Sequence, residues 1–304
     1  MLVLCEMRSA NMVNSFIKYI SFEKRYSKHT VISYQNDLGQ FQSFIYHKFQ
    51  ADQLAHATQL MIRSWVLSLM DDSISARTVN RKIASLRSFY KFLLKREVIT
   101  KDPTSKIRSL KTSKELPSFA DETEFSVFLD HVSFPDSFEG RRDQLILEML
   151  YGTGIRLAEL LGLKVSDINE SQSTIKVLGK RNKERIIPIS TSLYNLTKSY
   201  VQEKNHVYSH DHNSYLIVSK DGGQAYPMLI YRTVKKYLNN VSSLDKKSPH
   251  ALRHTFATHL LNKGADLNAV KDLLGHSSLA ATQVYTHNSL EKLKSIFDQA
   301  HPKA

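Results

Sequence analysis

Residues 248–287 contain four side chains whose types suit chemistry on a phosphodiester: His250, Arg253, His276 and Tyr285. An imidazole can move a proton near neutral pH, and a guanidinium offers a rigid fork of donors that matches phosphate oxygens. A phenol has a reference pKa of about 10, so it becomes a nucleophile only where cations and a base draw off its proton. These residue types are therefore suited to chemistry on a phosphodiester, provided that the four side chains meet.

The first pair, His250 and Arg253, is expected on one face of a helix. Ser248 and Pro249 suit an N-cap and a first helical residue, and apolar residues then recur at steps of three and four. This pattern predicts a helix over about 250–262. Side chains three residues apart on a helix point the same way, so the imidazole and the guanidinium should face one site.

The second pair is expected to follow two further helix boundaries. A short helix over about 267–274 should stop at Gly275, directly before His276. A third helix should begin at a Ser-Ser cap over 277–278 and carry Tyr285. A residue that follows a glycine at a helix end can project into a cleft, which is the position of His276.

A metal site is the main alternative for the histidines. His250 and His254 lie four residues apart, a spacing that can hold a metal ion on a helix. No acidic ligand lies nearby, and the sequence has no His-Glu-x-x-His arrangement. The sequence therefore predicts no metal and no cofactor. Taken singly, each of these residues more often packs or covers the surface, so the functional interpretation depends on the whole set.

Two motifs upstream supply further cations. The sequence YGTGI precedes Arg156 at the start of an expected helix, and Glu159 could either orient Arg156 or pair with a surface lysine. Residues 173–189 alternate β-branched residues around the sequence GKRN, which predicts a hairpin with Lys180 at its tip. A turn lysine is usually only solvated, so the assignment of Lys180 depends on the sequence around it.

Together these motifs resemble the tyrosine recombinase (phage integrase) family, and specifically its Xer-like bacterial members. The family pattern is an Arg, a β-hairpin Lys, a His-x-x-Arg pair, a second His and a nucleophilic Tyr, and every member is present here in order. The spacings between Arg156 and Lys180, within the His-x-x-Arg pair, from Arg253 to His276 and from there to Tyr285 are 24, 3, 23 and 9 residues. Whole phrases also match: TGIRLAEL, GKRNKERIIPI, HALRHTFATHLL and LLGHSSLAATQVYTH.

The resemblance implies a role for each residue. Tyr285 would attack a phosphodiester to give a 3′-phosphotyrosyl link while a 5′-hydroxyl leaves, and exchange with a partner strand through a Holliday junction would reverse the step. Because the bond energy is conserved in the covalent intermediate, no nucleotide hydrolysis is needed. The implied partners of the nucleophile are Arg156 and Arg253 on the non-bridging oxygens, His250 as general base, Lys180 as general acid and His276 as a further hydrogen-bond donor.

The resemblance also implies a mainly α-helical fold. We expect an N-terminal four-helix, SAM-like core-binding domain over 1–108, a linker over 109–117, and an α-rich catalytic domain with a small β-hairpin over 118–304. A last helix over about 290–300 should dock into a neighbouring subunit. Apolar periodicity predicts the remaining elements. They are helices over about 13–26, 28–47, 58–70, 75–97, 121–131, 142–151, 191–204 and 228–240, and a short strand over 215–218.

The charge of the chain favours a polyanionic partner. The formal net charge is +13, and residues 1–110 hold 17 Lys and Arg against 8 Asp and Glu, a net of +9. No run approaches the ~20 apolar residues of a membrane-spanning helix. The single cysteine, Cys5, excludes a disulfide within the chain and favours a reducing compartment, so we expect a cytoplasmic protein.

One expected helix carries a face of a single charge. On the helix over 75–97, apolar residues form one stripe and basic residues cluster opposite, without an acidic residue until Glu97. A solvated face normally mixes charges, so this face is a candidate DNA contact. The predicted DNA-binding residues are Arg77, Arg81, Lys91 and Lys95 on this helix, and Arg181 and Lys183 beside the hairpin tip.

The partners implied by the resemblance are a double-stranded DNA recombination site and further recombinase subunits. Four subunits, identical or including a related recombinase, would assemble on the DNA, and a DNA translocase could regulate them. The Xer-like role would be resolution of chromosome or plasmid dimers. Three alternatives remain: an integrase or resolvase of a mobile element, a type IB topoisomerase, which uses the same nucleophile without strand exchange, and a DNA-binding protein that no longer cuts.

Overall fold

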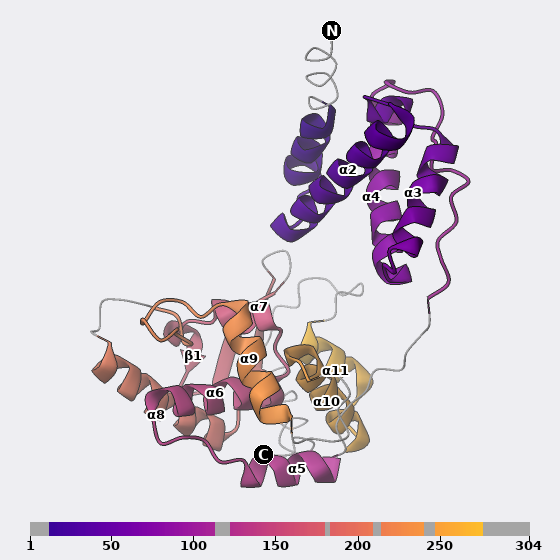
Figure 1. Cartoon of the computed structure of the whole chain (residues 1–304). Coiled ribbons are helices and arrows are strands. Elements are labelled where there is room, and N and C mark those ends of the chain that lie inside the picture. Colours follow the sequence, from indigo (N-terminus) through magenta and orange to yellow (C-terminus); the bar gives the residue numbers. More distant parts are fainter. Residues whose placement is uncertain (1–11, 113–121, 180–182, 209–213, 240–246, 276–304) are drawn as a thin grey trace. The chain divides into compact units, whose positions relative to one another are not determined.

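The computed structural model describes residues 12–112, 122–179, 183–208, 214–239 and 247–275 (Figure 1). The chain divides into two compact units, Met1–Glu115 and Leu116–Ala304. The fold is mainly helical with one small sheet, which confirms the predicted fold class. No helix within these described ranges is both long enough and apolar enough to cross a membrane.

The described part of the N-terminal unit is a bundle of four helices, with the short 3-10 turn η2 between the second and the third. The first is α-helical over 12–18 and continues as a π-helical turn. The other three helices begin at side-chain N-caps, within one residue of their predicted starts. Its elements are η1 (Tyr19–Glu23), α2 (Lys28–Phe49), η2 (Leu54–His56), α3 (Gln59–Asp71) and α4 (Ala76–Lys95). The caps of α2, α3 and α4 are the hydroxyls of Ser27, Thr58 and Ser75.

Aromatic and aliphatic side chains close the core of this bundle. Phe16 and Phe89 meet edge to face with ring centroids 5.4 Å apart, and Phe41 lies 4.9 Å from Trp65. Tyr90 is fully buried, and its hydroxyl donates to the carbonyl of Leu54 at 2.8 Å. Because a buried hydroxyl costs free energy unless it is hydrogen-bonded, this contact fixes α4 against the turn that follows α2.

A buried carboxylate lies between α2 and α4. Asp37 is 1% exposed and accepts hydrogen bonds from Arg81, Lys82 and Ser85 of α4. Lys82 also donates to Gln40. The basic helix therefore has an acidic partner from the neighbouring helix, which the sequence of α4 alone did not indicate.

The C-terminal unit places helices around a three-stranded antiparallel sheet of order β1-β2-β3. The strands are β1 (Ile168–Asn169), β2 (Thr174–Leu178) and β3 (Glu184–Pro188). The helices are α5 (Glu122–His131), α6 (Phe138–Thr153), α7 (Leu157–Gly162), η3 (Val165–Asp167), α8 (Thr191–Val207), α9 (Pro227–Leu238), α10 (Pro249–Asn262) and α11 (Leu267–Leu274). Helix α6 packs against α8, α9 and α10, so it is the centre of this unit (Figure 1).

Two predicted elements differ from the structure. Helix α6 begins at Phe138, four residues before the predicted start, because the Ser137 hydroxyl caps it by accepting from the Gly140 amide at 3.1 Å. The strand predicted over 215–218 is reduced to isolated bridges, Lys164 with Tyr215 and Val218 with Gln224. The predicted hairpin is present as β2 and β3, while the short strand β1 was not predicted.

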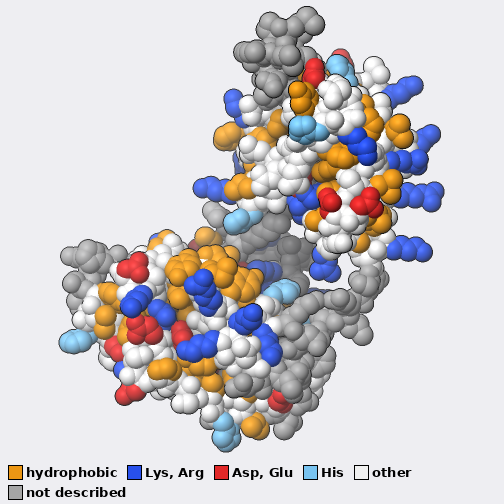
Figure 2. Space-filling model, in the orientation of Figure 1, with side chains coloured by type: hydrophobic (Ala, Val, Ile, Leu, Met, Phe, Trp, Pro, Cys, Tyr) orange, Lys and Arg blue, Asp and Glu red, His pale blue; other side chains and the backbone are white. Residues whose placement is uncertain are grey.

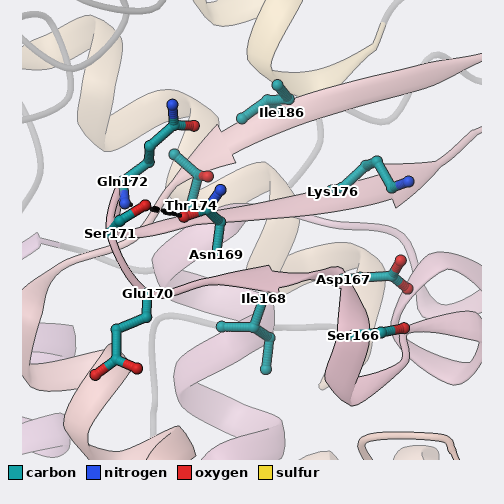
Figure 3. Close-up of a pocket in the computed structure, with 10 residues that line it drawn as sticks. All are labelled: Ser166, Asp167, Ile168, Asn169, Glu170, Ser171, Gln172, Thr174, Lys176 and Ile186. Atoms are coloured by element: carbon teal, nitrogen blue, oxygen red, sulfur yellow. Dashed lines mark hydrogen bonds between the residues drawn. The ribbon is translucent and has the colours of Figure 1, made fainter.

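The hairpin has two different faces. Val177 and Arg185 are paired across the strands and both are buried, whereas the pair Lys176 and Ile186 lies on the opposite face. Figure 3 shows Lys176 and Ile186 beside a shallow pocket of about 680 Å³ at the turn between β1 and β2. On the buried face of the hairpin, Arg185 directs a charged guanidinium into the C-terminal unit.

Candidate active site

The end of α11 gathers three arginines that come from three other elements. Each guanidinium donates to one of three consecutive carbonyls. The contacts are Arg185 Nε to Leu273 O at 2.7 Å, Arg253 Nη2 to Leu274 O at 2.5 Å and Arg156 Nη2 to Gly275 O at 3.2 Å. The last carbonyls of a helix lack partners within the helix and carry its negative partial charge, so they suit cationic donors.

Two of these arginines are the ones that the sequence singled out. Arg253 lies on α10 and Arg156 is the N-cap of α7, 97 residues earlier in the chain. Because they bind adjacent carbonyls, their guanidinium groups lie close together. The Arg156 side chain is 40% exposed, whereas Arg253 is 5% exposed and also donates from Nη1 to the carbonyl of Gly154 at 2.6 Å.

Glu159 is the counter-ion of this group. Its carboxylate accepts from the Arg156 amide at 2.8 Å and from Arg156 Nη1 at 2.9 Å. It also accepts two parallel hydrogen bonds from Arg185, at 2.9 and 2.8 Å. Of the two partners considered from the sequence, Glu159 therefore takes Arg156, and its second partner is a buried arginine instead of a surface lysine.

The electrostatics follow from one carboxylate among three guanidinium groups. Burial alone would raise the pKa of Glu159, but the hydrogen bonds and charge of Arg185, followed by the hydrogen bonds of Arg156, lower it to about 2. Burial and the nearby charge of Arg156 lower the pKa of Arg253 to about 10, still well above neutral pH. The group thus keeps an excess of positive charge at pH 7, as a site for a phosphate requires.

Arg185 was not assigned a function from the sequence. The feature of the sequence that could have identified Arg185 is a charge at an inward-facing position of a strand that also contains two isoleucines. Strand alternation alone would have placed Arg185 on the same face as Ile187, which is fully buried. The sequence could not supply its partners, because Glu159 and Leu273 are distant along the chain.

The remaining predicted residues divide into described and undescribed positions. His250 is exposed one turn before Arg253 on α10, and its ring centroid lies 6.2 Å from that of His254. Burial, followed by the charges of His250 and Arg253, lowers the pKa of His254. In the part of the chain that the structure describes, no three His, Cys, Asp or Glu side chains group as metal ligands would. Four predicted residues lie outside the described residues: Lys180, Arg181, His276 and Tyr285.

The predicted DNA-binding residues that are described are all exposed. On α4 they share the face opposite the buried stripe, and Lys183 directly precedes β3. Arg81 differs from the others, because Asp37 already binds its guanidinium. The exposed set is Arg77, Arg81, Lys91, Lys95 and Lys183.

The turn that delivers Arg156 depends on Gly154. This residue ends α6 with φ of +60°, and a methyl group there would lie 2.4 Å from Cδ1 of Phe256. We predict that Gly154→Ala lowers the stability by about 1–3 kcal/mol, the usual cost of left-handed backbone at a residue with a side chain, with more added by the collision. Thermal unfolding of the purified chain measures the loss.

Gly162→Ala is the matched control. Gly162 is the last residue of α7, and a methyl group added there would have no atom within 4 Å. The melting temperature of the Gly162→Ala variant should therefore stay close to that of the wild type. Equal melting temperatures for the Gly154 and Gly162 variants would contradict the proposed constraint on the turn.

Known proteins resemble this chain over most of its length. Residues 121–292 match the Phage integrase family, and residues 13–97 match the family described as Phage integrase, N-terminal SAM-like domain. A protein called tyrosine recombinase XerC from Chlorobaculum parvum is 35% identical, over 98% of this chain and 96% of its own length. One of the same description from Listeria innocua is 38% identical, over 95% of this chain and 97% of its own.

Solved structures show the same fold. The XerH site-specific recombinase, in a post-cleavage complex with palindromic difH substrate, matches with a TM-score of 0.69 and 21% identity, over 93% of each chain. The Tn1549 transposon integrase, in complex with circular intermediate DNA, matches with a TM-score of 0.68 and 20% identity. That match covers 92% of this chain and 98% of the integrase fragment.

Proposed function

The chain belongs to the phage integrase family and is a Xer-like tyrosine recombinase, an enzyme that cleaves and rejoins DNA by transesterification; from this premise we propose that six of its residues act on one phosphodiester. The six are Arg156, Lys180, His250, Arg253, His276 and Tyr285. The observation that carries the proposal is the meeting of Arg156 and Arg253 at the end of α11, directly before His276 in the sequence.

The proposed step balances without a cofactor. The phenolic oxygen of Tyr285 forms a bond to phosphorus, and the bond from phosphorus to the 5′ oxygen breaks. His250 accepts the phenolic proton, and Lys180 gives a proton to the leaving oxygen. Rejoining runs the same step backward, with a 5′-hydroxyl attacking the phosphotyrosyl bond.

The arginines supply charge where it develops. As the phosphorus becomes five-coordinate, negative charge grows on its non-bridging oxygens, and fixed donors stabilise this transition state more than the ground state. Arg156 can offer its exposed edge, since 40% of its side chain is accessible. Arg253 is held more rigidly, with its two contacts to Gly154 and Leu274.

We also propose that the basic face of α4 binds the DNA backbone. Figure 2 shows Lys and Arg side chains projecting from the N-terminal unit, which fits a surface for a polyanion. Arg77, Lys91 and Lys95 are exposed on this face, while Arg81 is partly neutralised by Asp37. The first three should therefore contribute more than Arg81.

We predict that Arg77→Ala combined with Lys95→Ala weakens DNA binding uniformly across sequences. Loss of two phosphate contacts should reduce the slope of log affinity against log salt by about two. Fluorescence anisotropy with a labelled duplex, repeated from 50 to about 200 mM salt, measures both the affinity and the slope.

The control is Arg63→Ala, which removes one exposed positive charge from α3 and leaves α4 intact. Its salt slope should stay at the wild-type value. If the α4 double variant shows the same slope as the wild type, the backbone contact is excluded.

We propose that the substrate is a pair of recombination sites on duplex DNA, bound by an assembly of several subunits that is either homomeric or shared with a related recombinase. Relatives called XerC match at least 95% of the chain, which supports resolution of chromosome or plasmid dimers over the mobile-element alternative. The proposed domains are 1–108 for core binding and 118–304 for catalysis, joined by the linker over 109–117.

The function can be tested with substrates that do not depend on a chosen target sequence. Nicked duplexes with a randomised centre are incubated with the wild-type chain, and those that become covalently attached are sequenced. Two copies of the selected site are then placed in the same orientation in one plasmid. Recombination should give two smaller circles, whereas a topoisomerase would only relax the plasmid and a non-cutting protein would leave it unchanged.

A further inference from the structure

Arg185 is a buried charge at the junction of three elements. It lies on β3 and is 5% exposed. Its guanidinium donates two hydrogen bonds to the Glu159 carboxylate of α7 and a third to the Leu273 carbonyl of α11. A fork-to-fork arginine–carboxylate pair is geometrically specific as well as strong. Arg185 therefore fixes the direction of the hairpin relative to both helices.

Two glycines lie against the same guanidinium. A methyl group on Gly275 would lie 3.1 Å from Arg185 Nη1, and one on Gly179 would lie 3.6 Å from the same atom. The Gly179 amide also donates to the carbonyl of Lys183 at 2.7 Å, which joins the two sides of the hairpin beside this contact. The Arg185 guanidinium thus lies close to the residue before Lys180 and to the residue before His276.

These contacts connect the hairpin to the arginine pair. Glu159 accepts from Arg185 and from Arg156, so one carboxylate sets the distance between the strand and a proposed phosphate ligand. Leu273 and Leu274 accept from Arg185 and Arg253, which ties the strand to the second phosphate ligand through neighbouring carbonyls. A shift of Arg185 would move the hairpin relative to both.

We propose, on the basis of the function given above, that Arg185 is a positioning residue that holds the general-acid hairpin in register with Arg156 and Arg253. It does not touch the DNA. Its effect passes through Gly179 to Lys180, whose amine must reach the leaving 5′ oxygen. Displacement of a reacting group by about 1 Å can cost about 10²-fold in rate.

The leaving atom can separate this role from simple stabilisation of the fold. With a 5′ oxygen, cleavage needs a proton from Lys180. With sulfur in the bridging position, a thiolate leaves, and thiols ionise near pH 8.5, so no proton donor is required. A variant that has only misplaced its general acid should therefore recover on the sulfur substrate.

The experiment uses the full chain and the nicked duplex selected above, prepared with either oxygen or sulfur at the scissile 5′ position. Single-turnover cleavage is measured for the wild type, Lys180→Ala, Arg185→Lys and Arg185→Gln. The readout is the ratio of the rates on sulfur and oxygen within one preparation. The fraction of folded protein cancels in this ratio, which keeps the comparison valid for a destabilised variant.

The matched control is Lys176→Ala. Lys176 lies on the outer face of the same hairpin (Figure 3). It pairs with Glu184 at 3.7 Å, and both side chains are more than half exposed. Its sulfur-to-oxygen ratio should equal that of the wild type. Arg185→Lys keeps the charge beside Glu159 but loses the fork, so it should cleave the oxygen substrate on the order of 10 to 10²-fold more slowly.

The outcomes distinguish this inference from the proposed function. Recovery of Lys180→Ala and both Arg185 variants on sulfur supports the positioning role. If Lys180→Ala recovers while the Arg185 variants lose equally on both substrates, the positioning role is wrong and the proposed function stands. If Lys180→Ala itself does not recover, Lys180 is not the general acid, and the role given to Arg185 fails with it.

Discussion

Tyr285→Phe is expected to bind DNA normally and to form no covalent adduct. The substitution removes one oxygen atom, the one that should bond to phosphorus, while the ring and its packing are kept. Without that oxygen no phosphotyrosyl intermediate can form, so the expected loss of cleavage is complete. The measurement is denaturing electrophoresis of the chain with the selected nicked duplex, together with a binding isotherm on the same DNA.

Peptide mapping of the wild-type adduct provides the positive control. Cleavage after Lys271 and Lys292 releases a peptide in which Tyr285 is the single tyrosine, and this peptide should carry the nucleotide. An adduct with Tyr285→Phe, or a nucleotide on any other peptide, would assign the nucleophile elsewhere.

Arg253→Ala is expected to slow cleavage by about 10² to 10³-fold, the range for loss of one fixed donor to a transition-state oxyanion. A second effect comes from the fold. The carbonyls of Gly154 and Leu274 lose a buried donor, which costs about 1–3 kcal/mol for an unsatisfied group. Single-turnover rates at saturating DNA, compared with the melting temperature of the same preparation, separate the two effects.

Arg141→Ala is the matched control for this variant. Arg141 belongs to the same unit and forms ion pairs with Asp136 and Glu203. Its substitution therefore removes an arginine and its ion pairs without removing any of the contacts to the end of α11. Its single-turnover rate should remain within a few-fold of the wild type. If Arg253→Ala cleaves as fast as Arg141→Ala, Arg253 is not a transition-state ligand.

The helices around the site could be predicted from short-range signals. Ser248 was predicted to cap the start of α10, and Gly275 was predicted to end α11. In the structure Ser248 is the N-cap of α10, and Gly275, in the left-handed conformation, is the C-cap of α11. The hairpin was predicted from the alternating β-branched residues on both sides of the sequence GKRN. These signals act over a few residues, so one sequence is enough to read them.

The partners of the arginines could not be predicted, because they depend on packing between distant segments. The sequence favoured neither of two partners for Glu159, and the structure adds Arg185, 26 residues away, as a second ligand. The acidic partner of Arg81 comes from α2, 44 residues before it. The early start of α6 depends on a local cap at Ser137 that the apolar pattern did not reveal.

The carbonyl ladder at the end of α11 has one more consequence. The carbonyl oxygens of Gly275 and Leu274 already accept hydrogen bonds from Arg156 and Arg253 in the absence of DNA. These contacts restrict the side chains to one arrangement. The enzyme can then meet its substrate without first rearranging this pair, and the electrostatic gain is not offset by reorganisation. The end of α11 therefore preorganises the two arginines that are proposed to bind the scissile phosphate.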